Sequence, residues 1–534
     1  MFDLSSIYNK KSIEFMSLPV IYSPSKDEKA ILGLRDSTEI FPGSILSSSS
    51  GLLVPVPKGF RLALLRQQRP PVFKYTFRKG NFLYILRLMT ELRTKLDYRY
   101  ETTERNPWIP INAETLVRIV WNYKDYLTYL IDNRVLECDN WYEPGTTSRR
   151  YRWCSDYFNG ENQEMEYEWL KDYKVLARIE QLRQHKNTQG RDIYPVLEHW
   201  LHKVEIDSDE AIKAVNVLLQ NSQEKNKEIK AASYLFNIEG IQKRQWFFTV
   251  DNKAGRLHTN LTNLPKWMRS MIKLEGESLV GMDIRNSQPY LLALLLNKEF
   301  YEEKEEQNGK GEIRIKDIIS KSNIIQDYKE ELNKAIYVPM LGFLNEMNDN
   351  QDFIVEKENY RKLVSEGNLY EYILRKAIEI PQYMDYGRDQ VKKLLMTIFY
   401  SDDAYPNEAK HLFSDSFPYI AGIIHDLKQL WYQHAPILLQ TLEAVVVLDR
   451  IVGRIIAENP QVPLFTVHDS VVTTPFYCDY VQAVMEEELT LAIGLKPNIK
   501  PEYWSEQSTI PFHKVEKKKG HLRKKSRWEL LRKR

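Results

Sequence analysis

The hydrophobic pattern changes abruptly within residues 278–296. The run SLVGMDI (residues 278–284) is short and almost continuously apolar, which is typical of a buried strand, and its one charged side chain is Asp283. The following SQPYLLALLL (residues 287–296) has the length and apolar content of a helix, with Pro289 in the first turn, where proline is tolerated. We therefore expect a strand that fixes the carboxylate of Asp283 at its end and leaves the oxygens free for a ligand.

A second apolar pattern, PLFTVHDSVVTTP (residues 463–475), places two β-rich runs on either side of a polar centre. It predicts a hairpin that presents Asp469 at its turn, between His468 and Ser470. Two aspartates on different strands can form a binding site for divalent cations when the fold brings them together. Two-metal phosphoryl transfer uses ions about 4 Å apart. The two patterns together are typical of the palm of a nucleotide polymerase.

A helical pattern, GRDQVKKLLMTIFY, spans residues 387–400. Residues four apart on a helix advance by about 400°, so each is rotated only about 40° from the one before. Arg388, Lys392, Met396 and Tyr400 therefore share one slowly twisting face. Two cations on that face suit the phosphates of a nucleotide, because Arg grips phosphate bidentately and Lys acts as a point charge.

The remaining segments divide the chain into further predicted regions. Residues 1–68 are poorly periodic and rich in proline, and they predict an irregular arm with strand character at GLLVPV. Residues 69–165 show helical patterns followed by a Pro-Gly turn between alternating segments. Residues 166–245 predict charged helices in a thumb-like or linking region, residues 246–512 hold the patterns described above, and residues 513–534 form a basic tail.

The hairpin predicted within residues 69–165 leaves two interpretations open. It contains a basic and aromatic run, Arg149, Arg150, Tyr151 and Arg152. Helices followed by such a hairpin are typical of a winged helix that contacts phosphate backbones. The alternative is a helical packing domain with a solvated basic turn.

Composition and charge exclude few classes of function. Hydrophobic residues make up 43% and charged residues 28% of 534 residues, which is ordinary globular composition. The net charge of +2 carries no information on partners, because a basic surface can be offset by acidic residues elsewhere. The three cysteines form no CxxC pair, and no apolar run approaches the ~18 residues that span a bilayer. We expect a cytoplasmic protein with reduced thiols.

Three segments resemble motifs of one polymerase superfamily. GRLHTNLTNLP (residues 255–265) is similar to the family A DNA polymerase motif in which Thr-Gly-Arg precedes Asn-Leu-Gln-Asn-Ile-Pro and the first catalytic aspartate. GRDQVKKLLMTIFYSD resembles the nucleotide-binding helix of phage-type single-subunit RNA polymerases, and HDS at 468–470 matches the RNA polymerase form of the third motif. The departures are Ala254 for Thr, Thr262 for Gln, Leu264 for Ile and Ser401 for Gly. The resemblance covers roughly residues 245–505.

The resemblance implies an α+β right-hand polymerase with palm, fingers and thumb. The patterns of residues 69–165 add an N-terminal, mainly helical domain of the winged-helix or packing type. The implied reaction is nucleotidyl transfer from nucleoside triphosphates to a 3′ end, directed by a template and supported by two Mg²⁺ ions, for which Mn²⁺ is an alternative. The expected partners are a nucleic-acid template and a primer or nascent strand. We expect a monomer without a membrane partner.

The resemblance also implies roles for individual residues. The residues expected to hold the metal ions are Asp283, Ile284 and Asp469. The residues expected to bind the nucleotide are Arg388, Lys392, Met396, Tyr400 and Gln288. Lys392 is also expected to protonate the leaving pyrophosphate. Arg256 is expected to contact the minor groove of the duplex, His468 to lie near the primer terminus, and Gln440, on one helical face with Glu443, to approach the template.

The choice of sugar depends on few positions. Gln288 stands five residues after Asp283, where family A DNA polymerases have Glu and single-subunit RNA polymerases have Gly. Its amide can block a 2′-hydroxyl or donate a hydrogen bond to it. The residues that match RNA polymerases are Met396, Thr397 and Ser470. Because Arg256 and NLTNLP, which match DNA polymerases, contact the duplex rather than the incoming sugar, we favour a DNA-directed RNA polymerase. A family A-like DNA polymerase without a proofreading exonuclease is the alternative.

Two further interpretations differ in class. The sequence YSDD at 400–403 resembles the Tyr-x-Asp-Asp hairpin motif of reverse transcriptases and viral RNA polymerases, although a long helical pattern precedes it. The second interpretation is a non-catalytic DNA-binding replication protein with a degenerate polymerase fold. The presence of both aspartates and of Arg388 and Lys392 argues against it.

Overall fold

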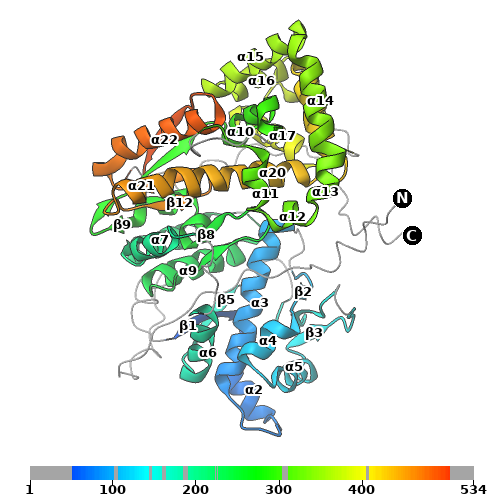
Figure 1. Cartoon of the computed structure of the whole chain (residues 1–534). Helices are drawn as coiled ribbons and strands as arrows, with labels where there is room; N and C mark the ends of the chain where they lie inside the picture. Colours follow the sequence, from blue (N-terminus) through cyan, green and yellow to red (C-terminus); the bar gives the residue numbers. More distant parts are fainter. Residues whose placement is uncertain are drawn as a thin grey trace.

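The fold is a mixture of helices and small antiparallel sheets (Figure 1). The computed structural model describes residues 51–100, 106–143, 147–158, 164–184, 191–222, 224, 226–302, 311–403 and 408–505. Within these residues the strands form five sheets, and buried hydrophobic side chains form two cores. The smaller core lies in residues 52–179, which we call the N-terminal unit, and the larger core draws on residues 193–504 and on Leu53. The α+β class predicted from the sequence is thus confirmed.

The N-terminal unit places helices before a hairpin, as the sequence predicted. Its elements, in chain order, are α3 (Lys79–Tyr100), β2 (Ile109–Pro110), α4 (Ala113–Ile119), α5 (Tyr123–Asp132), β3 (Leu136–Cys138) and β4 (Arg150–Trp153). The three strands form one antiparallel sheet in the order β2-β4-β3. Asn112 begins α4, because its side chain accepts a hydrogen bond from the backbone N–H of Glu114.

The N-terminal unit also contains a two-stranded sheet. Strand β1 (Leu52–Pro57) pairs along its whole length with β5 (Met165–Leu170), and α2 (Leu62–Gln68) and α6 (Tyr173–Gln184) follow the two strands. The irregular arm predicted for residues 1–68 is therefore wrong over Leu52–Gln68, although the strand character at GLLVPV is confirmed. Proline is tolerated here because β1 has only one hydrogen-bonded neighbour. Residues 1–50 and the basic tail lie outside the described residues.

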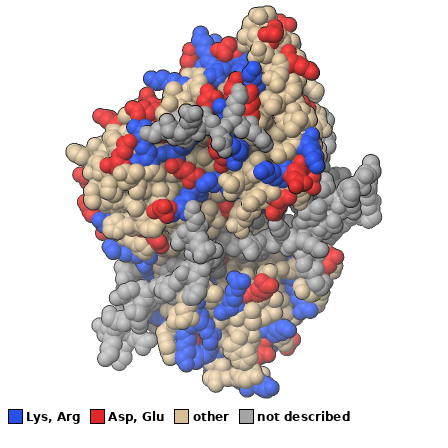
Figure 2. Space-filling model, in the orientation of Figure 1, with Lys and Arg blue, Asp and Glu red and all other residues tan. Residues whose placement is uncertain are grey.

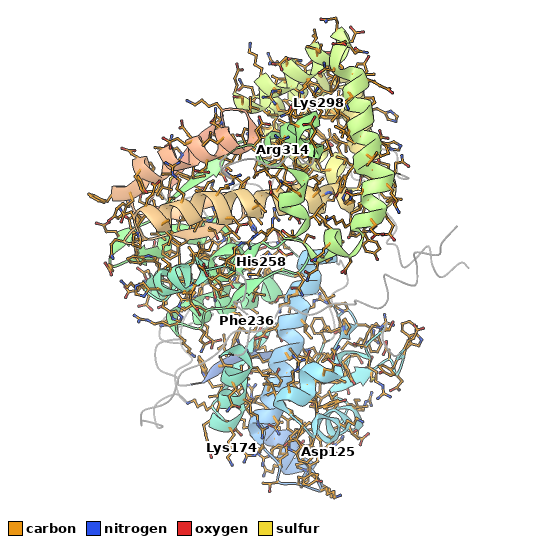
Figure 3. The ribbon with its side chains drawn as sticks, in the orientation of Figure 1. Asp125, Lys174, Phe236, His258, Lys298 and Arg314 are labelled. Atoms are coloured by element: carbon orange, nitrogen blue, oxygen red, sulfur yellow. The ribbon has the colours of Figure 1, made fainter. Side chains whose placement is uncertain are left out.

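The N-terminal unit is joined to the rest of the chain through a buried ion pair. Arg87 of α3 donates to the carboxylate of Glu239 at 2.9 Å, and both side chains are almost completely buried. Glu239 also accepts the backbone N–H of Leu53 at 2.7 Å and pairs with Lys243 at 3.2 Å. The guanidinium of Arg87 lies 4.5 Å from the ring centre of Phe236, which Figure 3 labels. These contacts satisfy a buried charge that would otherwise be costly.

The predicted linking region, residues 166–245, is helical for most of its length but also shares a sheet with the central segment. Its elements are α7 (Tyr194–Leu201), β6 (Val204–Ile206), α8 (Ser208–Asn221) and α9 (Lys227–Gln242). Strand β6 pairs with β9 (Ile272–Leu274), which also pairs with β10 (Glu277–Ser278). A further hairpin, β7 (Phe248–Val250) with β8 (Leu257–Thr259), leads into the first of the motif segments.

The central sheet has four strands in the order β12-β13-β11-β14. Their bounds are β11 (Val280–Ile284), β12 (Phe465–Val467), β13 (Ser470–Thr473) and β14 (Ile499–Tyr503). Helices α10 (Ser287–Leu295) and α22 (Cys478–Ile493) pack beside it in the larger core. A long helix consists of α20 (His434–Ala444), a π-helical stretch (Val445–Val452) and α21 (Gly453–Glu458).

A group of helices forms the upper part of the molecule in Figure 1. Its longer members are α14 (Val338–Glu346), α15 (Gln351–Ser365), α16 (Leu369–Ala377), α17 (Arg388–Tyr400), α18 (Glu408–Ser416) and α19 (Pro418–Asp426). Shorter helices, α11 (Ile315–Ile319), α12 (Asn323–Asp327) and α13 (Lys329–Leu332), connect this group to α10. Acidic and basic side chains are interspersed over the face shown in Figure 2. In the part of the chain that the structure describes, none of the helices has the length and apolar character needed to cross a membrane.

Candidate active site

Asp283 and Asp469 lie at one end of two neighbouring strands. Strands β11 and β13 are antiparallel, and their register pairs Met282 with Val471. Asp283 follows Met282, and Asp469 lies two residues before Val471, so both side chains are just beyond this pair. Along β11 the exposed Asp283 stands between the buried Met282 and Ile284, because successive side chains of a strand point to opposite faces. The structure thus brings together the two carboxylates that the sequence predicted to share a site.

The turn that presents Asp469 has an unusual backbone. In the β12–β13 hairpin, Val467 pairs with Ser470, which leaves His468 and Asp469 as a two-residue turn. His468 has φ of 57°, a left-handed conformation that residues other than glycine adopt at a cost on the order of 1–3 kcal/mol. The predicted hairpin is confirmed. The imidazole of His468 is exposed beside Asp469. The surrounding protein nevertheless displaces part of the water around the ring, and this desolvation, together with the positive charge of Arg256, lowers the pKa of His468.

The electrostatics at Asp283 indicate a negative charge that the protein does not fully compensate. The surrounding protein removes water from this carboxyl and raises its pKa to about 6, and the negative charge of Asp469 acts in the same direction. The positive charge of Lys392 opposes them. The Asp283 side chain nevertheless remains accessible to solvent. A carboxylate that is surrounded by protein and still reachable is suited to a cationic ligand.

These two carboxylates fit part of a divalent-cation site. Mg²⁺ prefers oxygen ligands, is commonly bound by one or two carboxylates, and completes its coordination with water and substrate phosphates. Among the described residues, no group of three or more His, Cys, Asp and Glu side chains is placed to hold a metal ion. The additional ligands must therefore come from elsewhere. Ile284, the third predicted ligand, ends β11 with its side chain buried, so only its backbone carbonyl is chemically able to serve.

Arg388 and Lys392, the two predicted cations, lie one turn apart on helix α17, as the sequence pattern predicted. Lys392 is exposed, and its charge reaches Asp283. Arg388, one turn earlier, is held by α16, because its Nε donates to the carboxylate of Glu371 at 2.7 Å. The guanidinium carbon of Arg388 also lies 5.2 Å from the ring centre of Tyr370. A phosphate would have to compete with Glu371, a residue that the sequence did not single out.

The C-terminal end of α17 meets α20. The hydroxyl of Tyr400 accepts a hydrogen bond from Nε2 of Gln440 at 3.3 Å, so the residues predicted to contact the nucleotide and the template lie together. The Tyr400 side chain is 37% exposed. Met396, one turn before it, is half-buried and packs against the larger core. The predicted face of α17 therefore changes from charged at Arg388 to apolar and aromatic at Tyr400.

Arg256 and Gln288 converge on one buried carboxylate, Glu443 of α20. Arg256 donates to Glu443 at 2.7 Å, and Nε2 of Gln288 donates to it at 2.6 Å. Burial raises the pKa of Glu443 to about 7, an effect that Arg256 opposes and Asp469 reinforces. Gln288 is 8% exposed, and its Oε1 has no hydrogen-bond partner among the described residues. The amide is thereby oriented, with its nitrogen on the carboxylate and its oxygen left as an acceptor.

Two residues that the sequence did not single out, Asp251 and His258, organise the loop that carries Arg256. The Asp251 carboxylate accepts backbone N–H groups of Lys253, Ala254 and Arg256 at 2.9, 2.7 and 3.1 Å. It also lies 3.3 Å from Nε2 of His258, whose ring centre is 6.3 Å from that of His468 (Figure 3 labels His258). An Asp that hydrogen-bonds the backbone of a following turn is a local pattern, so the sequence did contain a signal for it.

The YSDD sequence does not form the hairpin of a reverse transcriptase. Tyr400 ends α17, and the backbone N–H of Ser401 caps this helix on the carbonyl of Thr397 at 3.0 Å. Asp403 forms ion pairs with three cationic or titratable side chains, Lys410, Lys428 and His425. That interpretation is therefore wrong.

Comparisons with known proteins include a weak structural likeness. No protein-family model and no curated protein matches the sequence. Among solved structures, the polymerase domain of Pol1 from M. smegmatis, in a complex with DNA primer-template and dNTP, is similar at 12% identity, with a TM-score of 0.33. The match covers 55% of this chain and 56% of that one, so this chain spans about half the length of that structure. A likeness of this size assigns neither fold family nor function.

Proposed function

We propose that this chain is a template-directed nucleotidyltransferase that extends a 3′ end with nucleoside triphosphates and two Mg²⁺ ions. The observation that carries the proposal is the placement of Asp283 and Asp469 at the same end of two paired strands. The positive charge of Lys392 acts on the carboxylate of Asp283. Two accessible carboxylates that face a cationic helix match the needs of a reaction between a metal-bound triphosphate and a hydroxyl. In this proposal the central sheet is the palm, helices α17–α19 are the fingers and residues 166–245 form a thumb-like or linking region.

Each residue of the site has a distinct task. Asp283 and Asp469, with the carbonyl of Ile284, would hold the ions, which supply activation of the 3′-hydroxyl and neutralisation of the leaving pyrophosphate. The ammonium of Lys392 binds the phosphates and gives a proton to the pyrophosphate oxygen as it departs. Arg388 exchanges Glu371 for a phosphate of the incoming nucleotide, which it can grip bidentately.

The sugar preference follows from the environment of Gln288. Its Nε2 is engaged by Glu443, so the unpaired pole of the amide is the buried Oε1 acceptor. A ribose 2′-hydroxyl is a donor that can pair with such an acceptor, whereas a carboxylate in this position would act mainly by bulk and charge. We therefore propose a DNA-directed RNA polymerase, and a family A-like DNA polymerase without a proofreading exonuclease remains the alternative.

Extension of a labelled primer-template, and of template alone, tests the proposal. Ribo- and deoxyribonucleotides are supplied separately with Mg²⁺. Nucleotide-dependent product from the wild-type chain, lost in Asp283→Asn, is the expected result. Binding of template without any product under all four conditions would favour the non-catalytic replication protein.

A further inference from the structure

The first part of the described chain is strongly basic. Residues 51–90 contain eight Lys or Arg and no Asp or Glu. Five of the eight are neutralised: Lys58 by Glu164, Arg61 by Glu166, Arg78 by Asp172, Lys79 by Glu168, and Arg87 by Glu91 and Glu239. The other three, Arg66, Arg69 and Lys74, have no carboxylate partner among the described residues. In Figure 2 several clusters of Lys and Arg lie on the N-terminal unit, in the lower part of the view.

Tyr75, in the same stretch, forms an exposed aromatic pair with Trp121. Tyr75 is 45% exposed and Trp121, which follows α4, is 52% exposed, and their ring centres are 4.5 Å apart. The ammonium of Lys74 lies 5.7 Å from the Tyr75 ring centre. The two ring planes are inclined by 70°, so the rings meet edge to face, and the ring faces that this contact leaves open are surfaces on which further rings can stack.

The backbone beneath this pair is held firmly. The hydroxyl of Tyr129 donates to the carbonyl of Arg69 at 2.6 Å, and the hydroxyl of Tyr126 accepts the backbone N–H of Arg78 at 3.0 Å. Between these anchors, Phe73 packs on Tyr126 at a ring-centre distance of 4.9 Å. Residues 69–78 are thus fastened to α5 at both ends, which reduces the entropy lost when a ligand orders Tyr75.

The hairpin of the N-terminal unit is a poorer candidate for phosphate contacts, although its helices and strand order are those of a winged helix. Arg150 pairs with Asp139 and Arg152 with Glu137 at 2.6 Å, so their charges are largely cancelled. Tyr151 is 5% exposed and is part of the smaller core. Nor does α5 offer a cationic face for a duplex groove, because its exposed side chains, Lys124, Thr128 and Asp132, sum to no net charge.

We propose that the Tyr75–Trp121 surface binds single-stranded nucleic acid. Bases stack on the two rings while Arg66, Arg69 and Lys74 contact the phosphates. A duplex is disfavoured, because its base faces are already covered by neighbouring bases and only an unpaired strand can offer them to Tyr75 and Trp121. The site lies in the N-terminal unit and needs none of the residues of the candidate active site, so it goes beyond the proposed function.

Binding is tested by fluorescence anisotropy with labelled oligothymidylate and oligouridylate of about 16 nucleotides, which accommodates the site sizes of such proteins. The double variant Tyr75→Ala, Trp121→Ala should bind roughly tenfold or more weakly, because each stacked base contributes substantially to affinity. Tyr75→Phe, which keeps the ring, should bind like the wild type. Arg69→Gln with Lys74→Gln should reduce the dependence of affinity on salt.

Tyr173 provides a matched control. It is 65% exposed with the ammonium of Lys174 5.8 Å from its ring centre, but it has no aromatic neighbour comparable to Trp121 among the described residues. Tyr173→Ala should leave affinity unchanged. Equal losses from Tyr173→Ala and Trp121→Ala, wild-type affinity of the double variant, or equally tight binding of a blunt duplex would overturn the proposal. The proposed surface needs no residue of the candidate active site, so a chain without polymerase activity would still allow the test.

Discussion

Nε2 of Gln288 donates a hydrogen bond at 2.6 Å to the carboxylate of Glu443, a residue 155 positions away in the chain. Because Glu443 is 3% exposed, the amide of Gln288 is held by a partner that solvent cannot easily replace. We therefore propose that Gln288 and Glu443 together, rather than Gln288 alone, determine which sugar is selected.

Removal of either member should therefore weaken sugar discrimination. We expect Gln288→Gly and Glu443→Ala each to reduce the ratio of kcat/KM between ribo- and deoxyribonucleotides by roughly tenfold, because an oriented acceptor is lost in both. The double variant should lose little more than the worse single variant, since the two side chains act together. Fully additive effects would contradict the pairing. If the wild type uses only deoxyribonucleotides and Gln288→Gly admits ribonucleotides, Gln288 is a steric gate.

The two adjacent exposed lysines of α17, Lys392 and Lys393, allow the proposed catalytic face of this helix to be tested. Lys392→Ala should lower kcat much more than template affinity, because its charge meets phosphates whose negative charge shifts in the transition state. Lys393→Ala removes the same charge one residue further along, where the helix has turned by about 100°. That variant should retain most of the turnover. Equal effects from the two variants would show that α17 acts only as a basic surface.

The ion pair of Arg388 with Glu371 predicts an effect on nucleotide binding. Half-exposed pairs of this kind are worth about 0–1 kcal/mol, so Glu371→Gln should lower KM for the nucleotide by up to about fivefold. Glu379→Gln makes the same change of charge at an exposed position of the same region and serves as the control. A higher KM in Glu371→Gln would mean that Glu371 orients Arg388 rather than competing for it.

Buried His434 predicts a dependence of stability on pH. Burial lowers its pKa from 6.5 to about 4, and its ring contacts the Tyr337 hydroxyl at 2.9 Å and the Leu427 carbonyl at 2.9 Å. The folded-state pKa is depressed, so the stabilisation is fully present above about pH 6.5 and is lost as the pH falls towards 4. The full effect is roughly 3 kcal/mol.

The variant His434→Gln keeps a donor and an acceptor but does not titrate. Its melting temperature should fall less than that of the wild type between pH 7 and pH 5. An identical fall in both proteins would assign the acid sensitivity to other groups.

Local patterns predicted the elements that carry the candidate site, because each depends on a short stretch of sequence. The strand with Asp283, the hairpin with Asp469 and the helix with Lys392 all show their periodicity within about a dozen residues. Strand β1 was harder to recognise, since its two prolines are typical of irregular segments and are tolerated only because the strand lies at an edge.

The contacts that orient the side chains of the candidate site had no such local pattern. Glu371 reaches Arg388 from a different helix, and Glu443 meets Gln288 only after the long helix has packed beside α10. Such pairs depend on tertiary packing, which no periodicity encodes. Asp251 is the exception, because its role in the following turn is local and was open to sequence reasoning.

Asp283 and Asp469 are proposed to form one metal-dependent catalytic pair, and extension of a labelled primer-template by aspartate variants tests this assignment. Asp283→Asn and Asp469→Asn should each abolish product while template affinity, measured in parallel, stays close to that of the wild type. Asp402→Asn, in the YSDD sequence, should extend normally. Extension at the wild-type rate by Asp283→Asn or Asp469→Asn, or loss of extension in Asp402→Asn alone, would contradict the account.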